Sequence, residues 1–346
     1  MRKRKHKIRL IALGFIGFAA IASCYLLFQI SWNKSPMAEV IQYKKEGSGF
    51  SDVKVKTQDD KGRTATITVE KVSGDGKGNE YNLEKIETDF TLASGKNCKI
   101  SAKKGHVKDK DKKLFDLEEN VTLSTNSGIS LKTQKAFVDL SNEIVSGDSP
   151  IDMESKDLKL SADRYSFRLA AKRLRLGGKI RGELRRDKIT ADFLEAIFAD
   201  QNLEKLQQIT TTGNSCYTSS FYTINASQKM TYEEGDRKFS AQGDVCVKYD
   251  DGKKNFTIQS QSISGNIDAH GKIISARADG KLKIEAKDTI TTADRGELLN
   301  GKIFVSGNVV ISGPNGNILG KNATFDLKNG EIEIKKSSGV VNYDKK

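Results

Sequence analysis

Apolar and polar residues alternate with a period of two along most of the chain beyond residue 42. The clearest runs are Val121-Thr-Leu123, Ile129-Ser-Leu131, Val245-Cys-Val247, Leu282-Lys-Ile284 and Ile332-Glu-Ile334. A period of two with one apolar face indicates antiparallel strands in a sheet that is buried on one side. Turn sequences such as Asp250-Asp-Gly252 and Asn329-Gly330 separate these runs and favour tight hairpins. The pattern therefore predicts an all-β fold for the body of the chain.

One segment, residues 191–206, fits two periods. Its apolar positions could line one side of a helix as well as one face of a strand, and they are Phe193, Leu194, Ile197, Phe198, Leu203 and Leu206. Periodicity alone does not separate these two structures over so short a stretch. The segment stays open between helix and strand.

The first thirty residues differ from the rest of the chain. Residues 1–9 are basic, and an apolar run of 19 residues extends from Leu10 to Phe28. This length spans a bilayer core, so we expect a transmembrane helix over residues 10–30, with the basic segment cytoplasmic and the bulk of the chain on the other side of the membrane. Residues 31–42 then form a linker. A cleaved signal peptide and a lipoprotein signal ending at Cys24 are the alternatives, but the apolar run continues beyond both possible cleavage positions.

Composition narrows the range of functions. The chain has 346 residues, 30 Gly, 3 Pro and a net charge of +13, with one Trp and 7% aromatic residues. The scarcity of aromatic residues argues against a sugar-binding cleft. No CxxC or His/Cys cluster indicates a metal, no nucleotide motif is present, and no arrangement of nucleophile and base indicates catalysis. We therefore expect no metal, no cofactor, no nucleic acid and no enzymatic activity.

Three cysteines lie outside the expected membrane segment: Cys98, Cys216 and Cys246. An odd number allows at most one disulfide among them. Proximity in the sequence makes Cys216 with Cys246 a guess, because the sequence does not determine which residues pair.

Two parts of the chain repeat one another. Val121-Thr-Leu-Ser-Thr-Asn-Ser-Gly128 with Ala136-Phe-Val-Asp-Leu140 is similar to Val309-Val-Ile-Ser-Gly-Pro-Asn-Gly316 with Ala323-Thr-Phe-Asp-Leu327. A related start occurs at Glu119-Asn-Val121, Gly243-Asp-Val245 and Gly307-Asn-Val309. Hairpins have therefore been reused along the chain, which indicates a sheet extended by repetition.

A family resemblance follows from these residues. Lys99-Ile-Ser-Ala102, Leu117-Glu-Glu-Asn-Val121, Ala136-Phe-Val-Asp-Leu140, Gly147-Asp-Ser-Pro150 and Leu160-Ser-Ala-Asp163 occur in an order that resembles the LptC family, whose members are inner-membrane components of lipopolysaccharide export. The second half, with Ile209-Thr-Thr-Thr-Gly213, Gly243-Asp-Val245 and Gly307-Asn-Val309, is similar to the periplasmic LptA or OstA-like module. We interpret the chain as an LptC-like module at 43–186 fused to an LptA-like module at 187–346.

This resemblance implies two tandem, twisted, open β-jellyrolls whose apolar interior holds the acyl chains of lipopolysaccharide. A long trough with one apolar face from each strand suits such a lipid. An ordinary dry sandwich core is the alternative for each residue singly. The candidate lipid-binding residues are Val121, Leu123, Ile129, Leu131, Phe137, Leu140, Val309, Ile311, Ile318, Phe325 and Leu327.

The expected partners also follow from the resemblance. They are lipopolysaccharide, the inner-membrane ABC transporter of the export system, and LptA or an outer-membrane translocon component that pairs with a terminal edge strand, for which Glu331, Ile332, Glu333 and Ile334 are the candidates. Edge pairing uses backbone hydrogen bonds for affinity; an ordinary solvated edge is the alternative.

A basic run between residues 164 and 188 contains Arg173, Arg175, Arg181 and Arg185, which could contact headgroup phosphates. A solvated linker or a membrane-surface patch explains the run equally well. The alternative function for the whole chain is a membrane-anchored, β-rich protein that binds or hydrolyses cell-envelope polysaccharide.

Overall fold

The computed structural model describes residues 39–341 except for 47–48, 59–63, 75–79, 92–96, 110–113, 126–127, 129, 140–141, 143, 156–157, 169, 185–186, 200–205, 251–254, 270, 315, 327–331 and 336–337. The expected membrane helix at 10–30 lies outside these residues. Within the described part, no helix is long and apolar enough to cross a membrane. Every element there is a β-strand, and the strand pairings are antiparallel, so the all-β prediction is confirmed.

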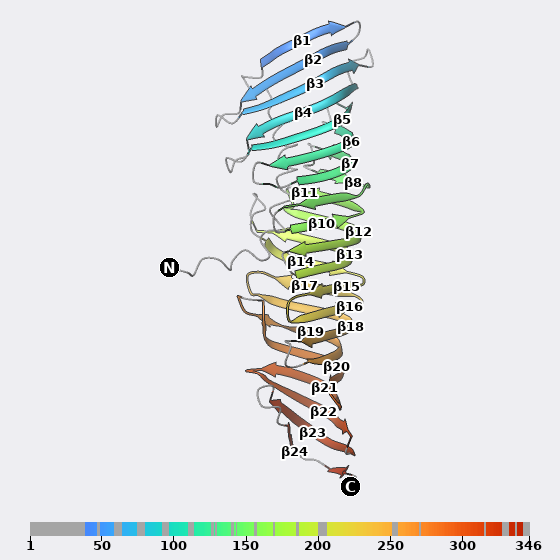
Figure 1. The fold of residues 1–346 in the computed structure, drawn as a ribbon, viewed down its shortest axis with the longest axis vertical. Helices are drawn as coiled ribbons and strands as arrows, with labels where there is room; N and C mark the ends of the chain where they lie inside the picture. The colour runs from blue at the N-terminus through green and yellow to red at the C-terminus, as the bar shows by residue number, and fades with distance from the viewer. Residues whose placement is uncertain are drawn as a thin grey trace, which may run out of the picture. The chain divides into compact units, whose positions relative to one another are not determined.

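The chain divides into two compact units, which are described separately. The N-terminal unit comprises residues 39–185 and 195–206 of the described part. The strands of this unit are antiparallel to their partners: those up to residue 139 each pair with the next one (Figure 1), and the short strands after them pair with opposite ends of a longer strand. They are β1 (Glu39–Glu46), β2 (Gly49–Gln58), β3 (Thr64–Gly74), β4 (Tyr81–Thr91), β5 (Asn97–Asp109), β6 (Leu114–Thr125), β7 (Ser130–Asp139), β8 (Ile144–Gly147), β9 (Ile151–Glu154), β10 (Leu158–Ala162), β11 (Arg164–Arg168) and β12 (Arg173–Leu184).

The C-terminal unit comprises residues 187–194 and 207–341 of the described part, and β13 (Asp187–Phe198) contributes to both units. Its further strands are β14 (Leu206–Thr212), β15 (Ser215–Thr218), β16 (Tyr222–Ala226), β17 (Lys229–Glu233), β18 (Lys238–Asp250), β19 (Asn255–Ile267), β20 (Ile273–Ala286), β21 (Thr289–Leu299), β22 (Lys302–Gly313), β23 (Gly316–Asp326), β24 (Ile332–Lys335) and β25 (Ser338–Val341).

The long strands are divided near their middle by a kink. In β22 the pairing register shifts between Ser306 and Val309, and the two residues between them, Gly307 and Asn308, have positive φ angles of 77° and 46°. Such a bulge bends the strand and increases its twist. The same device occurs in five strands, at Glu119-Asn120, Gly178-Lys179, Gly243-Asp244, Gly280-Lys281 and Gly307-Asn308.

An aspartate on the neighbouring strand holds the kink of β22, where the Asn308 amide Nδ2 donates to Asp294 Oδ2 at 3.0 Å. Asp192 of β13 makes a similar bond beside Gly213, which also has a positive φ: its Oδ2 accepts the backbone N–H of Asn214 at 3.0 Å. These bonds satisfy polar groups near the kink and fix its position along the strand. We call each kink with its neighbouring cap a corner.

The corners give each unit two arms, and the short strands show the division clearly. β16 pairs with residues 246–249 of β18, whereas β17 pairs with residues 238–242 of the same strand. Likewise β9 and β8 pair with opposite ends of β7. We name the arm that contains β9 or β16 arm A, and the arm that contains β8 or β17 arm B.

The segment left open between helix and strand is a strand as far as Phe198. Its buried positions are Ala191, Leu194, Ala196 and Phe198. The step of three residues from 191 to 194 includes Asp192, whose carboxylate accepts the backbone N–H of Asn214 and so forms part of a corner. A corner therefore imitates helical spacing in the sequence, which explains why periodicity did not decide between the two structures.

Candidate functional site: the apolar interior between the arms

The interior of the N-terminal unit is lined by apolar side chains from both arms. Leu123, Leu131 and Met153 come from arm A, and they are 3%, 7% and 3% exposed. Val145 and Tyr165 come from arm B and face the same cavity. Alternation along each strand directs these residues inward, because successive side chains point to opposite faces.

The cavity between these side chains has a volume of about 40 Å³. A single water molecule needs roughly 10–15 Å³ on this measure, so the cavity has room for a few waters at most. No long acyl chain fits into that volume.

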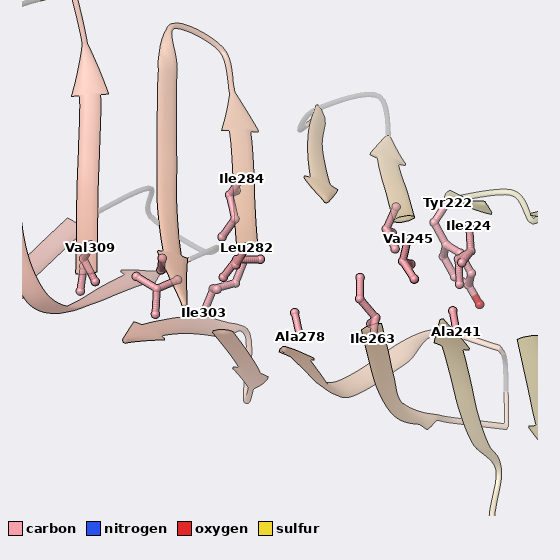
Figure 2. Close-up of a cluster of buried hydrophobic side chains, with 14 of the residues drawn as sticks. Tyr222, Ile224, Ala241, Val245, Ile263, Ala278, Leu282, Ile284, Ile303 and Val309 are labelled. Carbon is pink, nitrogen blue, oxygen red and sulfur yellow. The ribbon is translucent and has the colours of Figure 1, made fainter. Parts of the chain in front are cut away.

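The interior of the C-terminal unit has the same construction. Figure 2 shows side chains from two sets of strands pointing toward one another, with Ile284 and Val309 on one side and Ala241, Ile263 and Ala278 on the other. Arm A supplies the first set and arm B the second. The most deeply buried aliphatic side chains of this unit, such as Leu282, are at most about 2% exposed, and they belong to one continuous cluster.

Most of the described candidate residues lie inside. The buried ones, which are 1–7% exposed, are Val121, Leu123, Leu131, Val309 and Ile311. Ile318 pairs with Ile311 and is half-buried, and Phe325 packs partly against the core cluster of the C-terminal unit. Three candidates lie outside the described residues: Ile129, Leu140 and Leu327.

The placement of Phe137 on the inner face is wrong. Its neighbours Ala136 and Val138 are buried, at 7% and 2% exposure, whereas Phe137 is half-buried and lies on the outward face, with Lys108 Nζ 5.8 Å from its ring centre. The internal repeat explains the error, because Phe325 corresponds to Val138 in the first copy and not to Phe137. The size of Phe137 favoured burial, but the register of the strand places Val138 inside.

Residues 15–185 match the family described as lipopolysaccharide-assembly, LptC-related. The N-terminal half of the chain belongs to this family. No curated protein matches the chain. Membership places this half of the chain in lipopolysaccharide assembly, in a family of transport components. The two-armed, apolar interior of the N-terminal unit lies within the matched residues.

Polar side chains inside the LptC-family unit and its C-terminal neighbour are hydroxyls. The buried polar residues of the described part are Thr88, Thr133, Thr211, Ser215, Ser260 and Thr291. Thr133 shares a hydrogen bond with Ser149 Oγ at 2.9 Å, and Ser260 donates to the Asp279 carbonyl at 2.9 Å. Thr211 Oγ1 has no hydrogen-bond partner within the described residues. Small hydroxyls that bond to the backbone leave the interior apolar.

The candidate phosphate-binding arginines of this LptC relative lie on the outward face of β12. Leu174 and Leu176 point inward, while Arg175 donates to Glu195 Oε2 at 2.6 Å and Arg173 lies 3.5 Å from the same carboxylate. One acidic partner thus balances part of this charge. Arg181 is exposed on the same strand, and Arg185 lies outside the described residues.

The predicted pairing of Cys216 with Cys246 is wrong, because both residues are free cysteines. Asn225 on β16 pairs with Cys216 on one side and with Cys246 on the other. Two strand spacings, about 10 Å, therefore separate the cysteines, and a disulfide needs Cα atoms less than about 7 Å apart.

Aromatic residues line the far end of arm A in the C-terminal unit, and sequence reasoning missed them. Tyr217 and Tyr222 have ring centres 6.0 Å apart. Burial raises the pKa of Tyr222 to about 12 and raises that of Tyr217 further, with the Asp187 carboxylate adding to both. Both hydroxyls thus stay protonated donors at neutral pH. In the sequence, the position of tyrosines near the ends of strands is a weak signal for such an aromatic pair.

The described residues contain no group of His, Cys, Asp and Glu side chains that could hold a metal ion. At the C-terminal end, β24 and β25 both pair with β23. Ile332 is 44% exposed there and Ile334 packs partly against the core, while Glu331 lies outside the described residues.

Proposed function

We propose that this protein carries lipopolysaccharide by its acyl chains, held in the apolar interior between the two arms of each unit. The observation that supports this most is the composition of that interior, which receives apolar side chains from both arms and only hydroxyl groups among its buried polar residues. A lipid with several acyl chains needs a long apolar surface and no catalytic group. Membership of the LptC family gives the substrate class.

The two units act as successive carriers in this proposal. Residues 43–186 form an LptC-like jellyroll and residues 187–346 an LptA-like jellyroll, a fusion that the recurrence of the same corner in both halves supports. The chain is held at the inner membrane by residues 10–30, receives lipid from an ABC transporter, and passes it towards the outer membrane. Headgroup phosphates contact Arg181 and its neighbours on the outward face of β12.

The C-terminal strands provide the outgoing contact. β24 and β25 pair with β23 on one side, so a further strand can add to their other side by backbone hydrogen bonds. The partner is a separate LptA or the periplasmic part of an outer-membrane translocon.

Photo-crosslinking tests the lipid-binding interior with matched aromatic positions. A benzoyl-phenylalanine probe replaces Tyr165 or Phe325, which face the interior, and in control proteins it replaces Phe137 or Phe304, which lie on the outward faces of the same units. Phe304 is 41% exposed and sits next to Ile303, which pairs with Phe325.

In cells that make lipopolysaccharide, we expect crosslinks to lipid at Tyr165 and Phe325 and few at the two control positions. Crosslinks at neither inner position in folded protein, or equal yields on both faces, would refute a lipid-binding interior. The first of these results would leave the polysaccharide-binding alternative to be tested.

A further inference from the structure

One hydrogen bond joins the free ends of the two arms in the C-terminal unit. Tyr222 is the first residue of β16, at the end of arm A away from the corner. Its hydroxyl donates to the carbonyl oxygen of Gly271 at 2.7 Å. Gly271 lies in the turn between β19 and β20, where arm B ends. The contact therefore bridges the two arms at the side opposite to their shared corners.

The acceptor is held in place by the turn itself. The N–H of Gly271 donates to the Asp268 carbonyl at 3.1 Å, and the N–H of Lys272 donates to Asp268 Oδ1 at 2.9 Å. Gly271 has a φ of +79°, which glycine adopts without strain. The turn is thus a fixed platform that presents its carbonyl oxygen to Tyr222.

The donor is also held by its surroundings. Tyr222 is 6% exposed and lies against the ring of Tyr217, whose hydroxyl donates to Asp187 Oδ2 at 3.2 Å. Tyr222 belongs to the core cluster that also contains Ile224, and the two side chains lie next to each other (Figure 2). Its ring therefore packs into the apolar interior of arm A, while its hydroxyl reaches the turn where arm B ends.

We propose that the hydrogen bond from Tyr222 to Gly271 is a latch that closes the arms of the C-terminal unit and opens to admit an acyl chain. This inference rests on the proposed function, because it regulates the same interior. One neutral hydrogen bond shifts an equilibrium by roughly 2- to 10-fold. The latch is therefore weak enough to open and close repeatedly as lipid passes.

The variant Tyr222→Phe tests the latch because it keeps the ring and removes the donor. Tyr217→Phe is the matched control, since it removes the neighbouring hydroxyl, whose bond to Asp187 does not reach arm B. In the full-length protein with a photo-crosslinking probe at Phe325, purified lipopolysaccharide is added and crosslinked lipid is measured at successive times. We expect lipid to enter about 2- to 10-fold faster in Tyr222→Phe and at the unaltered rate in Tyr217→Phe.

Hydrogen exchange gives a second measurement that needs no lipid. Backbone amides of the turn at 268–272 should exchange faster in Tyr222→Phe than in the unaltered protein or in Tyr217→Phe. Unchanged lipid entry and unchanged exchange in Tyr222→Phe would overturn the latch, as would equal effects of both variants. If the unaltered protein yields no lipid crosslink at Phe325, the proposed function fails instead, while faster exchange in Tyr222→Phe would still establish the contact between the arms.

Discussion

Replacing Gly307 by Ala should damage one corner of the C-terminal unit. Gly307 has a φ of +77°, a conformation that costs an alanine about 1 kcal/mol. A Cβ atom at this position would lie only 2.2 Å from Asp294 Oδ2, so the carboxylate must move and its bond with Asn308 is lost. That exposed hydrogen bond contributes about 1 kcal/mol more. We therefore expect a loss of roughly 2 kcal/mol in the free energy of unfolding.

Gly301 provides the matched control for this change. It has the same φ of +77°, but no atom lies within 4 Å of the position that its Cβ would occupy. Gly301→Ala should therefore cost only the conformational part, about 1 kcal/mol. The double variant Gly307→Ala with Asp294→Ala removes the crowded carboxylate. Its free energy of unfolding should equal that of the Gly307→Ala protein or lie slightly above it.

Hydrogen exchange of the full-length protein in increasing urea measures these losses locally, in peptides that cover β21 and β22. This assay separates the C-terminal unit from the rest of the chain, where a single unfolding transition need not apply. If Gly307→Ala costs no more than Gly301→Ala, the contact with Asp294 does not constrain the corner, and the reasoning fails.

Three further predictions follow from the burial of side chains. Phe167→Ala, at a side chain with 0% exposure, should cost about 3–5 kcal/mol in urea unfolding, whereas Phe137→Ala should cost about 1; similar losses would contradict their opposite orientations. Thr211→Val should raise the urea midpoint, with a gain of about 1 kcal/mol from removing an unpaired hydroxyl; a lower midpoint would indicate a hidden partner. Tyr222 has a pKa raised from 10 to about 12, so its protonated form stabilises the fold below pH 10 and this contribution is lost as the pH rises towards 12. Stability measured from pH 8 to 11.5 should thus fall less steeply in Tyr222→Phe, and an unchanged slope would exclude this role.

The alternation of residues predicted the strands and most of the inner face, because a half-buried strand must repeat with a period of two. Leu123, Leu131 and Val309 lie where this pattern placed them. The pattern failed at the corners, where an extra residue reverses the alternation. Phe137 lies on β7 just beyond the point opposite the kink of β6, where the buried positions step by three residues from Thr133 to Ala136. Its size indicated burial, but its register directs it outward.

Contacts between residues far apart in the sequence could not be predicted. Nothing near Tyr222 indicates that its hydroxyl reaches Gly271, because that bond depends on the way the corners fold arm A against arm B. Proximity in the sequence also misled for Cys216 and Cys246, which a complete strand separates. Single-sequence patterns describe one strand at a time, whereas these contacts depend on three or more.

The corner also has a consequence for how such a protein can change in size. Gly280 and Gly307 begin the kinks of β20 and β22, and the length of chain between them corresponds to one hairpin. Each hairpin thus brings its own bend, and a hairpin can be gained or lost without redesigning those that remain. Chain length in this architecture is adjustable in whole steps, so that evolution can match the reach of a carrier to the distance it must cover.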